Sequence, residues 1–195
     1  MQRIAYRAGA LLVLLGGLCV AAVQAQEEPR IAILPTQYFS AGSRGAENVT
    51  RALEDQFAHN GYRVIPEERA RAAFRSMELR PDRHYPDSVA VRFGQELDAD
   101  LVAYPRLLGV GVPLASGPES ARNDEAAAVL HLRVLNVHTG RLIYFRQVSQ
   151  SFPRDPAAAG DLVLPPAAAR SAAAEVTRGY FQRVAGTREE QRQPR

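Results

Sequence analysis

Four histidines are the side chains of this sequence best suited to binding a metal ion: His59, His84, His131 and His138. A metal site needs several such ligands to converge on one point. His131 and His138 lie on or near one expected strand, seven residues apart, and an odd spacing directs side chains to opposite faces of a strand. We therefore expect surface or turn histidines, and neither a metal site nor a cofactor.

Two aspartates, Asp98 and Asp100, could form an acid–base pair of the kind that general acid–base catalysis uses. They flank the point at which a helix is expected to end and a strand to begin. At such a junction, carboxylates more commonly accept hydrogen bonds from local backbone amides, and we favour that structural role.

No nucleophile or phosphate-binding loop stands out in the rest of the chain. The sequence has no G-x-S-x-G elbow, and its single cysteine, Cys19, lies near the amino terminus. The glycine-containing stretch 109–117, GVGVPLASG, lacks the lysine and the following helix of a phosphate loop. The sequence therefore predicts no catalytic or cofactor-binding residue, and a protein that is not an enzyme.

Residues 1–25 have the pattern of a cleaved signal peptide. Two arginines precede an uncharged apolar run over 8–20, and a small-x-small site ends at Ala25, just before Gln26. The apolar run is shorter than the roughly 20 residues that cross a bilayer. We expect export to the periplasm and a mature chain that begins near Gln26.

Cys19 raises the alternative of a lipid anchor. A bacterial lipoprotein signal needs a small residue immediately before its cysteine, whereas Leu18 stands there, and the apolar run continues past Cys19. The favoured interpretation is that Cys19 is removed with the signal. Membrane association is expected only if Cys19 carries a lipid, as in an outer-membrane lipoprotein.

The composition of the mature chain limits the kinds of partner that it is expected to bind. All 24 basic residues are arginines, two of them lie within residues 1–25, and none of the 21 acidic residues does. The remaining residues therefore carry a formal charge of +1, which argues against nucleic acid as a partner. Their number is sufficient for a single domain, expected over 26–185, with an ordinary core and no disulfide.

Apolar periodicity and turn signals predict an α/β fold with about five strands in the order β-α-β-α-α-β-β-β-α. The expected elements are a strand at 31–34, a helix from Ser43 to about 60, a strand at 62–66, a helix at 67–77, a helix capped by Asp87 or Ser88, and strands at 101–114, 127–137 and 142–152, followed by a helix at 167–184. The first strand-helix-strand unit favours a parallel pair with helices packed on a mixed sheet.

Several positions within these elements carry specific expectations. Pro105 suggests an edge strand or a bulge, and Gly140 is placed for positive φ in a hairpin turn. The last helix should bury one stripe and so belong to the domain, while 186–195 should form a polar flexible tail. The stripe consists of Ala173, Val176, Tyr180 and Val184, with Phe181 beside it.

Four segments together carry a family pattern: IAILPTQ at 31–37, GYRVIPEERARAAF at 61–74, FGQELDADLVAYPRLLGV at 93–110 and LRVLNVHTGRLIYFRQV at 132–148. In order and spacing they resemble the TolB amino-terminal-domain-like group, which includes CsgG-like secretion proteins and lipoprotein activators of penicillin-binding proteins. Asp98 replaces a usual glycine, Tyr104-Pro105 replaces a run toward glycine, and Asn136 replaces a usual aspartate.

The resemblance implies a mixed sheet with helices on its faces, and a non-catalytic interaction or assembly module of the bacterial envelope. Its partners would be envelope proteins of unknown identity, and no site residue carries over. The alternatives are an oligomeric outer-membrane secretion subunit of the CsgG type and an envelope enzyme. The first needs inserted membrane-spanning hairpins with strands of about 9–11 residues, for which the polar stretch 115–125 is too short.

Overall fold

The computed structural model describes residues 28–38, 43–111, 125–153 and 163–192. Within them the chain forms six strands and four helices, which confirms the predicted α/β fold. The elements are β1 (Arg30–Ile33), β2 (Gln37–Tyr38), α1 (Ser43–His59), β3 (Arg63–Val64), α2 (Glu67–Ser76), α3 (Asp87–Glu96), β4 (Leu101–Gly111), β5 (Glu125–Asn136), β6 (Leu142–Pro153) and α4 (Pro166–Arg192).

All six strands belong to one mixed sheet with the order β3-β1-β4-β5-β6, and β2 pairs with β4 beyond the end of β1. Strand β1 is parallel to both β3 and β4, whereas β4, β5 and β6 form an antiparallel meander. The two-residue strand β2 was not predicted from the sequence. It extends the line of β1 along β4 after a short interruption at Leu34–Thr36.

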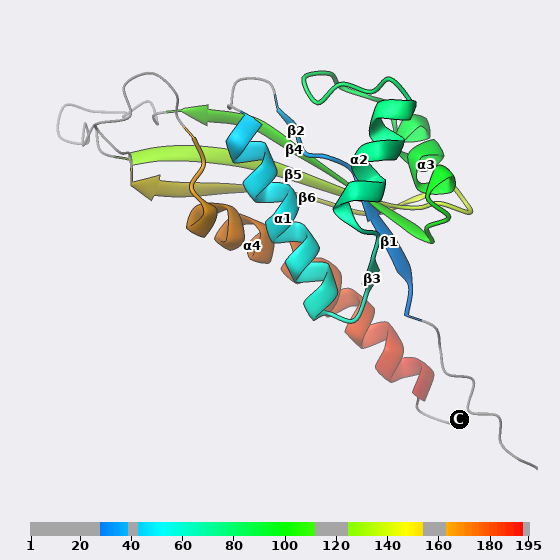
Figure 1. Cartoon of the computed structure of the whole chain (residues 1–195). Helices are drawn as coiled ribbons and strands as arrows, with labels where there is room; N and C mark the ends of the chain where they lie inside the picture. The colour runs from blue at the N-terminus through cyan, green and yellow to red at the C-terminus, as the bar shows by residue number, and fades with distance from the viewer. Residues whose placement is uncertain (1–27, 39–42, 112–124, 154–162, 193–195) are drawn as a thin grey trace, which may run out of the picture.

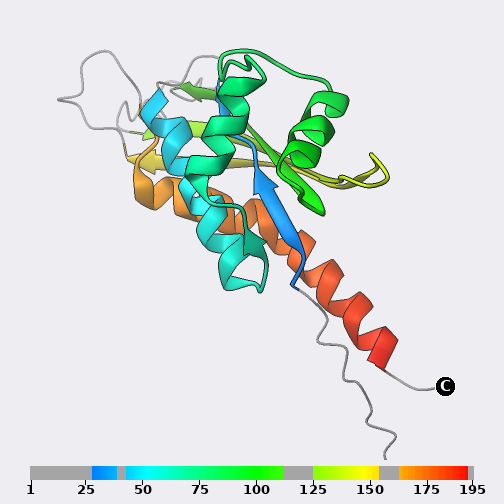
Figure 2. The ribbon, with the colours of Figure 1, turned by 45° about the vertical axis from the view of Figure 1, so that its right-hand side comes forward.

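Helices cover the sheet unequally on its two faces. Helices α1 and α4 lie side by side on one face, and α2 and α3 lie on the other (Figures 1 and 2). Because side chains alternate along a strand, strands β1, β4 and β5 contribute to both cores. At the end of β1, Ile33 packs beneath α1, and its neighbour Leu34 packs beneath α2 and α3. Along β5 and β6, helices α2 and α3 reach only the end near Leu135 and Val137.

Helix α1 folds as its spacing predicts, with Val49, Leu53 and Phe57 fully buried on one face. Burying each such side chain contributes roughly 1.5–3 kcal/mol. That face packs against α4, where small alanines let the two helices approach each other. Tyr180 of α4 belongs to the same core and packs near Phe57, toward the carboxyl end of α1. The Tyr62 hydroxyl donates to the Tyr180 hydroxyl at 3.1 Å, so the end of this core is hydrogen-bonded as well as aromatic.

Pro105 does not mark an edge strand, so that half of the prediction was wrong, whereas the alternative of a bulge has a counterpart in the register shift that follows it in β4. Strand β4 has partners on both sides, and the register shift lies between Leu107 and Gly109. The Ala103 carbonyl accepts from the Leu34 N–H at 2.9 Å, so the backbone groups of Ala103 point toward the β1 side of β4. Backbone groups two residues apart on a strand point the same way, so the nitrogen of Pro105 also faces the β1 side. On that side, Pro105 falls between the pairing with β1 and the pairing with β2, where its missing N–H removes no ladder bond.

The predicted cap of α3 was also wrong. The helix begins at Asp87, the preceding Pro86 occupies the cap position, and no side chain caps the helix. The Asp87 carboxylate instead accepts from Arg133 Nη2 at 2.6 Å. A long-range ion pair has taken the place of the local bond.

The hairpin turn and the last helix agree with expectation in their main features. Gly140 has φ +68°, and Ala173, Val176 and Tyr180 of the predicted stripe are buried. Helix α4 continues to Arg192 and does not end near Val184 (Figure 1). It therefore includes most of the segment 186–195, whose flexibility stays a prediction.

The expected signal segment 1–25, with Cys19, lies outside the described residues. Among the helices that the structure does describe, none combines the length and the apolar character needed to cross a membrane.

Candidate functional site

The two aspartates singled out in the sequence tie the first strand to the junction between α3 and β4. Asp100 Oδ2 accepts from the Arg30 backbone N–H at 2.8 Å, and the Asp98 carboxylate pairs with the Arg30 guanidinium. The expected bond to a backbone amide is present for Asp100, but its donor is distant in sequence and not local. That N–H donor is the main cause that holds the pKa of Asp100 below its ordinary value, and His138 Nε2, 3.1 Å from Oδ1, adds to it. Both aspartates therefore have structural partners.

The four histidines are dispersed. His131 contacts Gln147 and Phe145, His138 contacts Asp100, and His84 Nδ1 lies 3.2 Å from the Tyr104 hydroxyl. His59 is exposed at the end of α1. Among the described residues, no group of three or more His, Cys, Asp or Glu side chains could hold a metal ion.

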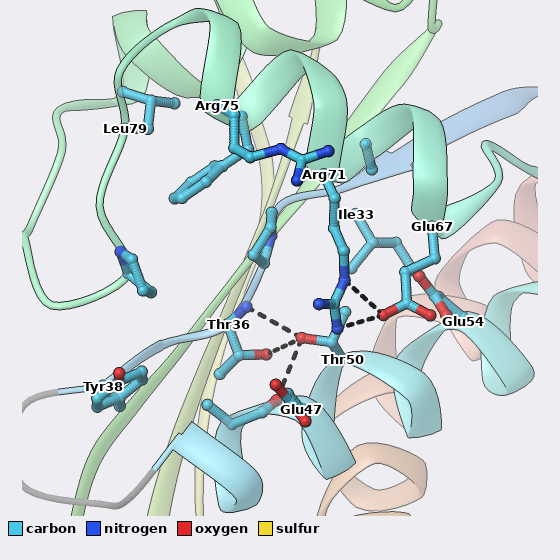
Figure 3. Close-up of a pocket in the computed structure, with 15 residues that line it drawn as sticks. Ile33, Thr36, Tyr38, Glu47, Thr50, Glu54, Glu67, Arg71, Arg75 and Leu79 are labelled. Atoms are coloured by element: carbon cyan, nitrogen blue, oxygen red, sulfur yellow. Dashed lines mark hydrogen bonds and ion pairs between the residues drawn. The ribbon is translucent and has the colours of Figure 1, made fainter.

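A pocket of about 300 Å³ opens between α1 and α2, beyond the carboxyl ends of β1 and β3 (Figure 3). Strand β1 leads, through β2, into α1 on one face of the sheet, whereas β3 leads into α2 on the other face. In open α/β sheets, ligands bind where the connections of two adjacent parallel strands diverge in this way. The lining residues are Ile33, Pro35, Thr36, Tyr38, Ala46, Glu47, Thr50, Glu54, Glu67, Ala70, Arg71, Phe74, Arg75, Leu79 and Pro81.

Most of the lining is apolar and is fixed by the fold. Phe74 of α2 is buried and meets Phe93 of α3 edge-on, with ring centroids 6.5 Å apart. The Tyr38 N–H donates to the Pro81 carbonyl at 3.0 Å, which attaches β2 to the loop after α2. The side of the pocket formed by that loop is therefore held to the sheet.

Two threonines fix the polar floor. Thr50 Oγ1 donates to the Ala46 carbonyl at 3.1 Å and accepts from the Thr36 N–H at 3.0 Å. The two hydroxyl oxygens are 2.7 Å apart. Thr50 therefore ties helix α1 to the segment that follows β1.

The carboxylates of the pocket differ in their partners. Glu67 Oε1 accepts from Arg71 Nε at 2.8 Å and lies 2.6 Å from Arg71 Nη2. Glu54 makes no hydrogen bond or ion pair with a described residue, and it lies behind Glu67 in Figure 3. Burial is the main cause that raises the pKa of Glu54, to about 7, and the charges of Glu67 and Asp55 raise it further. Arg51 and Arg71 oppose this shift only in part. The pKa of the Glu54 carboxyl is therefore well above that of an exposed glutamate.

Sequence reasoning did not find this pocket, although two patterns in the sequence point to it. Glu47, Thr50 and Glu54 follow one another at helical spacing on α1 beside its apolar stripe, and Glu67 and Arg71 do the same on α2. Each pattern alone is typical of a solvated helix face. Only the fold brings them to the two sides of one pocket.

A second candidate surface is the face of β5 and β6 that α1 and α4 do not cover. Among the described residues, no helix covers this face beyond the end near Leu135 (Figure 1). Phe145, at its centre, is 53% exposed, and Leu142 and Ile143, beside the hairpin turn, are 44% and 37% exposed. β6 is also the last strand of the sheet. We call this surface the β6 face, defined by Leu142, Ile143, Phe145, Gln147 and Ser149.

The β6 face lies in a positive environment. Its cross-strand neighbours include His131 and Arg133 of β5 and Arg106 of β4. Burial is the main cause that lowers the pKa of nearby His84, and the charges of Arg106 and Arg133 lower it further. Asp87 pairs with Arg133 and offsets part of this charge.

No protein-family model matches the sequence, and no match to a curated protein was found. Solved structures do match. Lipoprotein GNA1162 from Neisseria meningitidis has a TM-score of 0.50 and 14% identity over 81% of this chain and 99% of its own. The protein CT253 from Chlamydia trachomatis has a TM-score of 0.49 and 12% identity over 82% and 96% of the two chains. LpoB from E. coli has a TM-score of 0.49 and 19% identity over 65% of this chain, and the match spans 59% of LpoB. At 14% identity, the GNA1162 match shows a shared fold.

Proposed function

We propose that this chain is an exported, non-catalytic interaction module of the bacterial envelope, related to the TolB amino-terminal-domain-like and CsgG-like group. The signal pattern over 1–25 supports export to the periplasm. The four resemblance segments and the shared fold with a protein named as a lipoprotein support the envelope assignment. In the favoured form the mature chain begins near Gln26, and a lipid on Cys19 is the alternative.

The exposure of Phe145 on the β6 face is the observation that carries this proposal. Exposed apolar patches on a folded domain mark interaction sites, and aromatic and arginine side chains are enriched at the centres of protein interfaces. Phe145 lies beside Arg133 and His131, with Leu142 and Ile143 at the turn. The partner that fits is a protein with an apolar centre ringed by acidic side chains, because opposite charges favour encounter and register.

The test is a photo-crosslinking residue at position 145 of the full chain, expressed in its bacterial host. The matched control places the same residue at Ala72, which is exposed on α2 away from the β6 face. We expect a discrete adduct with a second envelope protein from position 145 and none from position 72. Ser149→Glu should reduce the adduct, because it adds negative charge to the β6 face, whereas Ser149→Asn should not.

Two other outcomes would overturn the proposal. An adduct of twice the mass of the chain would favour the oligomeric secretion subunit, and equal labelling from both positions would show that the β6 face is not an interface. Intact mass of the exported protein tests its location separately. A chain beginning at Gln26 supports the periplasmic form, and a lipid-bearing Cys19 supports the anchored one.

A further inference from the structure

We propose that the outer edge of β6 binds a short extended segment of a partner protein as an added strand, and that this segment alternates apolar and acidic side chains. The inference rests on the proposed function, since it says how the partner at the β6 face is held. It adds backbone pairing at the strand edge to the side-chain contacts of the β6 face. A strand edge with open N–H and carbonyl groups is a template for such pairing.

The hydrogen bonds around the hairpin determine which backbone groups of β6 point outward. The Val137 N–H donates to the Asp100 carbonyl at 2.9 Å, so Val137 faces β4. The Asn136 N–H donates to the Arg141 carbonyl at 2.9 Å, so Asn136 faces the β6 side. Because neighbouring residues of a strand face opposite partners, the even-numbered residues of β5 bond to β6. The register pairs them with the even-numbered residues of β6 from 144 to 152, and the odd-numbered residues there therefore point outward.

The outward groups are open along the middle of β6 and occupied at its two ends. The Ile143 carbonyl accepts from Arg183 Nη1 at 3.5 Å, and the Ser151 carbonyl accepts from Gln150 Nε2 at 3.0 Å. Between these two points, the odd-numbered residues of 145–149 form no outward backbone hydrogen bond with a described residue. Each of them offers one donor and one acceptor, so a segment of about five residues can pair along this stretch.

Strand β6 is held in place by β5 and by α4. Its other edge pairs with β5 along the strand, and the Tyr144 hydroxyl donates to the Val176 carbonyl of α4 at 2.7 Å. The Ser171 hydroxyl of α4 lies 3.1 Å from Gln150 Oε1, so a second bond joins β6 to the helix. Because β6 is already extended and fixed on one face, most of the ordering on binding falls to the added segment.

Charge selects the kind of segment that fits. Residues 141–153 and 163–186 comprise β6 and the part of α4 that packs on the sheet, and they contain five arginines but one acidic residue, Glu175. The arginines are Arg141, Arg146, Arg170, Arg178 and Arg183. Pairing with β6 of a second copy would bring two such basic sets together, and like charges on facing strands are destabilising. An acidic segment of a different protein is favoured instead.

The two sides of the added strand meet different surfaces. Side chains alternate along a strand, so every second one lies on the side of Phe145 and the others lie on the side of Arg146 and α4. Phe145 is 53% exposed and favours an apolar neighbour. Arg146 reaches α4 at Gly179, where an added Cβ would lie 3.1 Å from Arg146 Nη1, and its charge favours an acidic neighbour. The partner segment is therefore expected to alternate apolar and acidic residues.

The experiment titrates a capped eight-residue peptide of alternating valine and glutamate into the mature chain, residues 26–195, followed by NMR. Two isomers of the peptide carry N-methyl groups on every valine or on every glutamate. Valine N–H groups point to one edge of the extended peptide and glutamate N–H groups to the other, so each isomer blocks one edge. We expect saturable binding of the parent peptide, and at least about tenfold weaker binding of one isomer than of the other. Equal affinity for the two isomers would overturn the proposal, because binding would not depend on one peptide edge.

Amide hydrogen exchange measures the pairing from the side of the protein. With the parent peptide at ten times its dissociation constant, exchange at Phe145, Gln147 and Ser149 should slow about tenfold. Arg146 and Val148 already bond to β5 and should change much less. Binding without this alternation would mean that the peptide lies on the β6 face through side-chain contacts, and strand addition would be refuted.

The acidic character of the segment is tested with matched probes and variants. Arg146→Gln should weaken binding of the parent peptide about three- to tenfold. Its control, Arg69→Gln, is at an exposed arginine of α2 and should change affinity by less than about twofold. A peptide with lysine in place of glutamate should bind at least about tenfold more weakly, and equal affinity for it would contradict the acidic assignment.

This inference and the proposed function can fail separately. An adduct from position 145 in the host, with no peptide binding up to about 10 mM, would keep the β6 face as an interface and refute the added strand. Peptide binding with alternating protection, but no adduct in the host, would support the chemistry of the strand edge and overturn the proposed function.

Discussion

Replacing Glu54 by glutamine should make the protein more stable at pH 8 and leave its stability nearly unchanged at pH 5. The folded-state pKa of Glu54 is raised from 4.5 to about 7. The folded protein therefore holds more protons than the unfolded chain between these two values, and the contribution of the group is full below pH 4.5 and lost as pH rises through 7. Glutamine cannot ionise and lacks this loss.

The magnitude follows from the size of the shift. Each pKa unit corresponds to about 1.4 kcal/mol, so the full shift sets an upper limit of about 3.4 kcal/mol. Glu54 is only half buried, and solvent screens part of its interactions. We therefore expect Glu54→Gln to be more stable than the parent chain by about 1–2 kcal/mol at pH 8.

Urea denaturation of both chains at pH 5, 6, 7 and 8 measures this difference. Taking the difference between the chains cancels the titration of every other group, provided that the substitution acts locally. Asp55→Asn, at an exposed neighbour on the same helix, should show a smaller dependence on pH, because it removes only one of the charges that raise the pKa of Glu54. If the stability gain of Glu54→Gln is the same at pH 5 and pH 8, Glu54 is not titrating with a raised pKa and the electrostatic account of the pocket is wrong.

Further changes test the packing by chemical denaturation. Gly140→Ala should cost about 1 kcal/mol, because Gly140 has φ +68° and a Cβ at this position would point into open space, so the loss is purely conformational; an unchanged denaturation midpoint would contradict this. Gly94→Ala should lower the free energy of unfolding by about 1–3 kcal/mol, since its Cβ would lie 2.5 Å from Val137 Cγ2. Its control, Gly186→Ala, lies in open space on α4 and should raise the free energy of unfolding by up to about 1 kcal/mol. Adding Val137→Ala should relieve the Gly94→Ala clash, and additive losses would argue against it. A chain that ends at Gln150 lacks α4 and should unfold or aggregate; an unchanged, cooperative midpoint would show that α4 is not part of the core.

The main elements were predictable because their signals are local. The spacing of Val49, Leu53 and Phe57 defines one face of α1, and the alternation through β5 and β6 defines a hairpin around Gly140. These patterns depend only on helical and strand periodicity. Hence the α/β class and the order of its main elements follow from the sequence alone.

The errors have a common cause in long-range contacts. Pro105 has the local signature of an edge, but the change of partner from β1 to β2 accommodates it inside the sheet. Asp87 has the local signature of a helix cap, but Arg133, distant in sequence, takes its carboxylate. Asp100 likewise bonds the backbone of Arg30 and not a neighbouring amide. In each case a tertiary partner replaced the one that local chemistry suggested.

The pocket could not be predicted from local patterns, because it depends on how α1 and α2 leave the sheet. The two helices cover opposite faces, so their buried stripes meet the sheet and not each other. Beyond the ends of β1 and β3, the sides of the helices that carry Glu54 and Glu67 both line the pocket. Two helix faces that would each be ordinary in solvent thus place like charges at one partly buried site, which raises the free energy of the ionised Glu54 carboxylate.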